Sequence, residues 1–161
     1  MKSRTKARSI ALQVLYELDL TDHQPGQVLE ERIRAENVSE EKKADFERIV
    51  EFARQIVVGV SPLVNQLDEI ISKHAPEWPL DQVAVVDRNI LRIALWEFAV
   101  AECTPVKVAI NEAIELAKVF GSDSTPRFVN GVLGSLALKQ DEIHAKFNDI
   151  SKLNNESSKI E

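Results

Sequence analysis

The sequence is poor in the residues that build disulfide frameworks, metal cages and many-stranded sheets. Its 161 residues include one Cys, three His, five Gly and six Pro. A single Cys excludes a disulfide framework, and the widely spaced His offer no Cys/His cage, so we expect no metal and no other cofactor. Scarce Gly and Pro, beside a charged fraction of 29%, favour long helices over sheets. A reducing cytoplasm is the simplest location for such a chain.

Long apolar runs are also missing. No stretch reaches the roughly 18 apolar residues that a membrane span needs. The basic N-terminus is not followed by the apolar run and cleavage site of a signal peptide. The hydrophobic fraction is nevertheless 44%, which is enough for a buried core and excludes an intrinsically disordered chain. We therefore expect a globular protein with no membrane partner.

The net charge of −6 is distributed unevenly. The first nine residues contain four basic side chains and no acidic one, whereas the other 152 residues contain 16 basic and 26 acidic residues. The four basic side chains are Lys2, Arg4, Lys6 and Arg8. A basic arm on an acidic body is typical of a protein that binds a polyanion such as a nucleic acid. A solvated terminus without a partner is the alternative that composition leaves open.

Apolar residues recur every 3.6 positions along most of the chain and predict an all-α fold of about seven helices. The first helix is expected over residues 3–20, with Leu12 and Tyr16 lying off its apolar face. That face consists of Ala7, Ala11, Val14, Leu15 and Leu18. The helical pattern thus places Tyr16 away from the core.

Two prolines interrupt the helical pattern over residues 75–79, close to the expected boundary between two subdomains. These subdomains, about 1–60 and 61–138, are expected to pack into a single domain that ends at residue 138. Beyond it, residues 139–161 form a polar extension that we expect to be partly disordered.

Residues 80–101 are apolar on nearly all sides and predict a helix buried in the core. Arg92 lies one turn after Arg88, and we expect it to pair internally with Glu97 or with a Glu of another helix. Asp87 on the same helix is expected to face a partner.

The last core helix is expected to begin at Thr125-Pro126. It contains Gly131 and Gly134, each of which weakens a helix by about 1 kcal/mol relative to Ala. We expect close contact with a neighbouring helix to compensate for both.

No catalytic motif is present. The glycines form no Gly-rich phosphate loop after a strand, and no Gly-x-Ser-x-Gly elbow occurs. The His residues have no catalytic partner nearby in the sequence, and the paired Glu residues lie on charged faces. We therefore expect a binding protein and not an enzyme.

A second group of basic and aromatic residues surrounds the turn near residue 121. RNA-binding proteins stack unpaired bases on aromatic rings and hold phosphates with Arg or Lys. The sequence thus predicts an RNA contact at Lys118, Arg127 and Phe128. An ordinary place in the core is the alternative for the aromatic ring.

Four segments resemble the NusB family of bacterial transcription antitermination factors. They are residues 4–20 with Ala11-Leu-Gln-Val-Leu-Tyr16, then Asp87-Arg-Asn-Ile-Leu-Arg-Ile-Ala-Leu-Trp-Glu97, Lys107-Val-Ala-Ile-Asn-Glu-Ala-Ile-Glu-Leu-Ala-Lys-Val-Phe-Gly121 and Phe128-Val-Asn-Gly-Val-Leu133. Residues 21–79 share only the helix spacing, and the extension after residue 138 has no counterpart that we can name.

The resemblance implies an all-helical NusB-like bundle that binds the boxA element of ribosomal RNA leaders. It further implies a heterodimer with the small-subunit ribosomal protein known as NusE, which joins other Nus factors on RNA polymerase and suppresses premature termination. A homodimer is also compatible with the resemblance.

Particular residues match the family's functional positions. By resemblance, the arm at Lys2, Arg4, Lys6 and Arg8 is the basic RNA-binding terminus, and Arg127 and Phe128 are the basic and aromatic pair of the RNA surface. Tyr16 and Asp87 match positions that face the ribosomal protein. The arm departs from the family pattern because its bases alternate with Ser, Thr and Ala, which implies weaker RNA binding.

Two other functions stay open at this point. A NusB-like domain also precedes the catalytic domain of a family of ribosomal RNA cytosine methyltransferases, so the chain would be a free-standing accessory RNA-binding module. No Gly-rich loop for a methyl donor occurs in the 161 residues. The other alternative is a helical adaptor that binds only proteins and carries an inert tail.

Overall fold

The computed structural model describes residues 2–77 and 79–160, with side chains through residue 156. These residues form eight α-helices and no β-strand, which confirms the expected all-α fold. The helices are α1 (Ser3–Leu20), α2 (Pro25–Ala35), α3 (Lys43–Val60), α4 (Val64–His74), α5 (Val85–Leu95), α6 (Val106–Phe120), α7 (Thr125–Ala137) and α8 (Gln140–Ile160). Short 3₁₀ turns η1 (Glu40–Lys42), η2 (Ser61–Leu63) and η3 (Leu80–Gln82) and a π-helical turn η4 (Trp96–Val100) lie between them.

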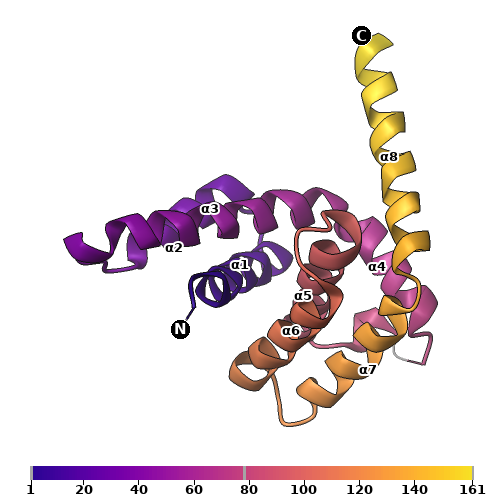
Figure 1. Cartoon of the computed structure of the whole chain (residues 1–161), viewed down its shortest axis with the longest axis horizontal. Coiled ribbons are helices and arrows are strands. Elements are labelled where there is room, and N and C mark those ends of the chain that lie inside the picture. Colours follow the sequence, from indigo (N-terminus) through magenta and orange to yellow (C-terminus); the bar gives the residue numbers. More distant parts are fainter. Residues whose placement is uncertain (1, 78, 161) are drawn as a thin grey trace.

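Helix α1 packs against α2 and α3 on one side and against α5 on another, so it connects the first helices of the chain to the later ones (Figure 1). Its predicted bounds are those observed, and its predicted apolar face is buried, Leu18 only in part. Leu12 was expected off that face, yet it is only 2% exposed because neighbouring helices cover α1 on more than one side. Tyr16 remains 41% exposed.

The helix expected over residues 80–101 is divided into η3, α5 and η4. In the π-helical turn the N–H of Ala101 donates to the carbonyl of Trp96, five residues back. Such a turn frees carbonyl groups that need other donors. Helix α8 supplies these donors. Gln140 Nε2 donates to the Phe98 carbonyl at 2.8 Å, and Nδ1 of His144 lies 3.0 Å from the Ala99 carbonyl oxygen.

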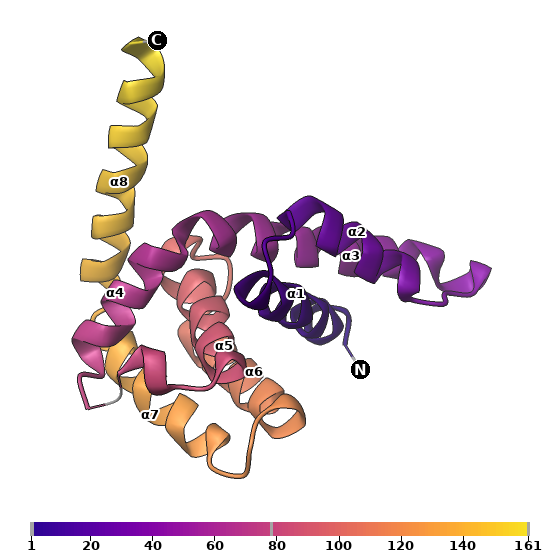
Figure 2. The ribbon, with the colours of Figure 1, turned by 180° about the vertical axis from the view of Figure 1, so that it is seen from behind.

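The C-terminal extension, for which we expected partial disorder, is helical through Ile160, and Glu161 lies outside the described residues. Its first half is docked on the body by Ile143 and Phe147, which are at most 5% exposed. Its second half projects away from the other helices in both views (Figures 1 and 2).

Glycine spacing misled the sequence interpretation. A Cβ added at Gly131 or Gly134 would meet no heavy atom within 4 Å, so the expected close helix contact at these residues is wrong. The close approach occurs instead at Gly59 in α3, where an added Cβ would lie 2.3 Å from Cε2 of Trp96.

Arg92 pairs internally, as expected, but its partners are aspartates. Its guanidinium donates to both carboxylate oxygens of Asp68 at 2.7 Å and to Asp19 at 2.7 Å. Burial alone would lower the pKa of Arg92, but the hydrogen bonds and negative charges of the two aspartates outweigh it and raise that pKa. The cluster fastens α1 and α4 to α5.

Buried apolar residues from both halves of the chain belong to one continuous cluster. The division into two subdomains near residue 60 therefore stays a prediction. No helix among the described residues is long and apolar enough to cross a membrane.

Candidate nucleic-acid interface

The exposed part of the basic arm consists of Lys2 and Arg4. Both side chains are exposed at the beginning of α1, whose first turn contains no acidic residue. The Arg4 guanidinium lies 4.4 Å from the ring centroid of Phe52, which restrains it by a cation–π contact. Lys6 is less available because its ammonium group lies 3.4 Å from Glu36.

Arg8 does not belong to the exposed arm, which corrects the prediction from sequence. It is 2% exposed and donates from Nε and Nη2 to the carboxylate of Glu97 at 2.8–3.1 Å. Its Nη1 lies 3.4 Å from Glu112, and Thr104 donates to Glu97 at 2.7 Å. The second turn of α1 passes beneath α6 and η4, so the cation is buried and the acids compensate it. Arg8 is therefore withdrawn as an RNA contact.

Helix α6 connects the arm to the turn between α6 and α7, residues 121–125, which we name the 120s turn. The Thr5 hydroxyl donates to Glu112 at 3.0 Å, so the first turn of α1 lies beside the middle of α6. At 1.5 Å per residue, the helix axis from Glu112 to Gly121 spans about 13 Å. Both views show the start of α1 and the end of α6 near the same edge of the molecule (Figures 1 and 2). The arm and the 120s turn therefore lie on one side, within reach of a short RNA.

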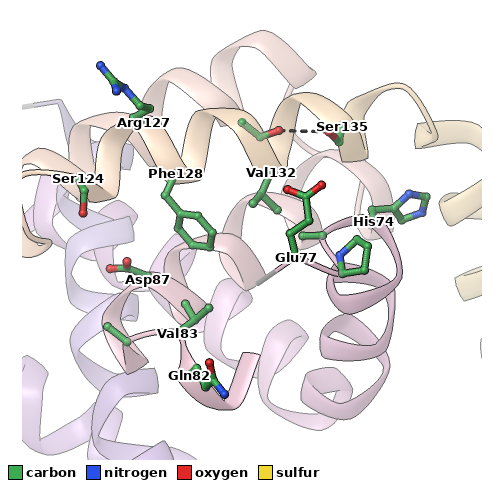
Figure 3. Close-up of a pocket in the computed structure, with 14 residues that line it drawn as sticks. His74, Glu77, Gln82, Val83, Asp87, Ser124, Arg127, Phe128, Val132 and Ser135 are labelled. Carbon is green, nitrogen blue, oxygen red and sulfur yellow. Dashed lines mark hydrogen bonds between the residues drawn. The ribbon is translucent and has the colours of Figure 1, made fainter. Parts of the chain in front are cut away.

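The three predicted RNA contacts that flank the 120s turn differ in orientation. Lys118 is exposed near the end of α6 and lies 3.1 Å from Glu115. Arg127 is exposed on α7 and points outward, whereas the half-buried ring of Phe128 points into a cavity (Figure 3). The structure thus places the cation on the surface and the ring in a cavity wall.

The cavity has a volume of about 580 Å³ and lies between the end of α4, the start of α5 and helix α7. Phe128 and Val132 supply apolar wall, and Asp87 and Glu77 supply negative charge (Figure 3). Arg127 lies at its rim. The cation of this region therefore lies outside the cavity, whereas the negatively charged interior suits donor groups.

Asp87 is half-buried and bonded to Thr125, a residue that the sequence interpretation did not select. The Thr125 hydroxyl donates to the two carboxylate oxygens at 3.1 and 3.2 Å. Burial raises the pKa of Asp87, and the hydrogen bond from Thr125 partly offsets that increase. Thr125 was recognised only as a helix start, because nothing in the local sequence indicates a partner 38 residues earlier.

Tyr16 and Asp87 lie on adjoining elements. Asp19, one turn after Tyr16, accepts a hydrogen bond from Asn89 at 2.9 Å, and Asn89 follows Asp87 by two residues. The C-terminal half of α1 therefore meets the N-terminal half of α5. Asp87 lies about 200° around α5 from Asn89 and faces Thr125 of α7.

No group of three or more His, Cys, Asp or Glu is placed to hold a metal ion in the part of the chain that the structure describes. The geometry alone does not identify the protein family, but a comparison with known families does.

The model of the NusB family matches residues 5–138. The chain belongs to the NusB family.

Curated relatives in the NusB family are similar over nearly their whole length. The transcription antitermination protein NusB of Roseiflexus sp. (strain RS-1) is 46% identical over 141 residues, which are 86% of this chain and 94% of the relative. The NusB protein of Bacillus subtilis (strain 168) is 47% identical over 136 residues, covering 84% and 95%.

Solved NusB structures have the same fold. T. maritima NusB is 31% identical with a TM-score of 0.70, covering 90% of this chain and 93% of that chain. A crystal structure of the antitermination factors NusB and NusE in complex with double-stranded RNA has a TM-score of 0.71 at 27% identity, covering 91% and 98%.

The NusB family match divides the candidate residues. Tyr16, Asp87, Lys118, Arg127 and Phe128 lie within residues 5–138, whereas Lys2 and Arg4 precede the matched segment. Helix α8 lies beyond it. The 120s turn thus belongs to the NusB part of the chain, and the exposed cations of the arm lie at its margin.

Proposed function

We propose that this chain is a transcription antitermination factor that binds boxA RNA of ribosomal RNA leaders together with a NusE-type ribosomal protein. The complex acts in the bacterial cytoplasm, where it joins other Nus factors on RNA polymerase and prevents premature termination. The observation that carries the proposal is similarity over most of the chain to NusB antitermination proteins. The similar structure that contains NusB, NusE and RNA supports the two partners.

RNA binding is proposed to begin at the exposed cations. Lys2 and Arg4 neutralise phosphates at one end of the surface, and Lys118 and Arg127 do so at the other, because phosphate contacts supply most nucleic-acid affinity. Phe128 contacts a base from the cavity side, and Lys6 contributes when it leaves Glu36. The acidic remainder of the chain disfavours unspecific RNA binding.

The partner is proposed to occupy the junction of α1 and α5. Tyr16 supplies an exposed aromatic ring, which is a preferred residue at protein interfaces. Asp87 supplies a carboxylate for a donor of the partner. Function by this mechanism consists of binding alone, with no catalysed reaction. A homodimer that uses the same junction would compete with the partner.

Binding of the full chain to boxA RNA and to a scrambled RNA of equal length tests the proposal, with and without a purified NusE-type protein. We expect preference for boxA RNA and tighter binding in the presence of the partner, because two linked contacts raise overall affinity. Equal binding to both RNAs at moderate salt would contradict the proposal. Recovery of an RNA methyltransferase and no ribosomal protein with the chain would favour an accessory module instead.

A further inference from the structure

The hydroxyl of Thr125 joins the 120s turn to the proposed partner face. It donates to Asp87 on α5 and accepts the backbone N–H of Ser122 at 2.9 Å. The side chain of Thr125 is buried, with a relative exposure of 1% for the residue. Neither RNA nor a partner protein therefore reaches this hydroxyl directly, and any effect of it on binding passes through its neighbours.

The direction of each hydrogen bond follows from the donors available. An ionised carboxylate can only accept, so the single proton of the Thr125 hydroxyl is donated to Asp87. The oxygen of Thr125 then accepts from the N–H of Ser122 and from the Ser122 hydroxyl, which lies at 3.1 Å. One donor and two acceptor sites are all used, which fixes the orientation of the side chain.

Packing in the 120s turn leaves little room for a second arrangement. A Cβ added at Gly121 would lie 2.5 Å from Cβ of Thr125, so the threonine fills the space beside the glycine. The N–H of Thr125 also donates to the Ser122 carbonyl at 3.1 Å. Displacement of Thr125 must therefore displace the turn and the first residues of α7, including Arg127.

We propose that Thr125 is a positioning residue that couples partner binding at Asp87 to RNA binding at Arg127. The proposal rests on the function proposed above and names how its two binding faces communicate. A donor or cation of the partner at Asp87 holds that carboxylate in place as an acceptor for Thr125, which keeps the 120s turn in one geometry. Thermodynamic linkage then requires RNA to strengthen partner binding by the same factor as the partner strengthens RNA binding.

The electrostatic state of Asp87 supports the coupling. Burial raises the pKa of its carboxyl group, so the environment disfavours the charge that Thr125 needs as an acceptor. A partner cation beside Asp87 favours the charged form. The partner thereby stabilises the ionised acceptor without touching the RNA surface.

The experiment measures boxA RNA binding by the full chain without a partner, comparing Asp87→Ala, Thr125→Val, Thr125→Ser and the double variant D87A/T125V. Removal of a negative charge near an RNA surface should strengthen binding by simple electrostatics. The proposal predicts the opposite sign: D87A and T125V each weaken RNA binding by roughly three- to tenfold, the range expected for one lost hydrogen bond. T125S retains the hydroxyl and stays close to wild type, and the double variant is no weaker than the weaker single variant.

Addition of the NusE-type protein completes the test. We expect the partner to strengthen RNA binding of wild type and T125S by a larger factor than that of T125V. Unchanged or stronger RNA binding by D87A, or additive effects in the double variant, would overturn the coupling while boxA binding by wild type leaves the proposed function intact. Loss of boxA preference in wild type itself would overturn both. Circular dichroism checks folding, and D87A measured in the wild-type and T125S backgrounds decides the sign should T125V fail to fold.

Discussion

Two arginines in α1, one helical turn apart, belong to different parts of the molecule. Arg4 is exposed and restrained only at its guanidinium by Phe52. Arg8 is buried and held by the carboxylates of Glu97 and Glu112. Both are arginines of the same helix, so the difference arises from their surroundings. Helix α6 and the turn η4 bring the carboxylates of Glu112 and Glu97 to Arg8 but not to Arg4. A basic run in a sequence can therefore contain both a binding surface and a structural ion pair.

The largest expected effect is on protein stability and comes from substitution of the buried Arg8. Arg8→Met should lower the free energy of unfolding by about 3–5 kcal/mol, because it leaves Glu97 buried without its cation. Urea denaturation at neutral pH measures the change. Replacement of both members in R8M/E97M should cost less than the sum of the single variants, since it removes the unpaired charge. A loss below about 1 kcal/mol for Arg8→Met would show that the pair is not structural.

Glycine extends the comparison to a second residue type. Gly59→Ala should destabilise the fold by about 1–3 kcal/mol, because the new methyl group overlaps the indole of Trp96. Gly131→Ala and Gly134→Ala should stabilise it by about 0.4–1 kcal/mol, since both sites are open and Ala favours a helix. Thermal unfolding of the three variants checks the signs. Destabilisation by all three would contradict the packing described for α7.

Substitution of the exposed Arg4 should weaken RNA binding and leave the stability of the fold nearly unchanged. Arg4→Ala should alter the free energy of unfolding by less than about 1 kcal/mol, the range of an exposed cation–π contact. RNA binding should weaken, and the log–log salt slope should fall in magnitude by about 0.7 for one lost phosphate contact on a single strand. Filter binding over a range of salt concentrations measures the slope. The variant Arg54→Ala is the matched control and should leave the slope unchanged, because Arg54 lies about 200° around α3 from Phe52 and pairs with Glu30 at 3.3 Å.

The smallest expected effect is the pH-dependent contribution of the Asp87 carboxyl group to stability. Asp87 has a raised pKa and no cation partner among the contacts above, unlike Glu97. Because the folded-state pKa exceeds the unfolded value, the contribution of Asp87 to stability is complete below the unfolded pKa and is lost as pH rises through the folded one. The unfolding free energy of wild type minus that of Asp87→Asn should therefore be larger near about pH 4 than near about pH 7. A difference that grows with pH would contradict the burial of this carboxyl group.

Local periodicity was sufficient to predict the all-α fold, but not helix α8. The bounds of α1 and the start of α7 at Thr125 follow from apolar spacing and from a Thr-Pro start signal. The π-helical turn η4 was not predicted, because it interrupts a continuous apolar run and depends on side chains of α8 for its carbonyl partners. The helical form of the extension was missed because its apolar residues are few and become buried only on the body of the protein.

The candidate site divides in the same way. Exposure of Arg4, Tyr16 and Arg127 follows from their places on helix surfaces, which the sequence shows. Burial of Arg8 and the contact between Thr125 and Asp87 depend on residues 89 and 38 positions away in the sequence. No local pattern contains such information, and only packing of the helices reveals it.

The central claim is that the arm and the 120s turn form one RNA surface along α6. The most direct measurement is the salt dependence of boxA RNA affinity for wild type, Arg4→Ala, Arg127→Ala and the double variant. We predict that each single substitution lowers the magnitude of the slope by about 0.7 and that the double variant lowers it by about 1.4, because both cations contact phosphates of the same strand. An unchanged slope for either single variant, or a double variant equal to one single variant, would contradict a shared surface.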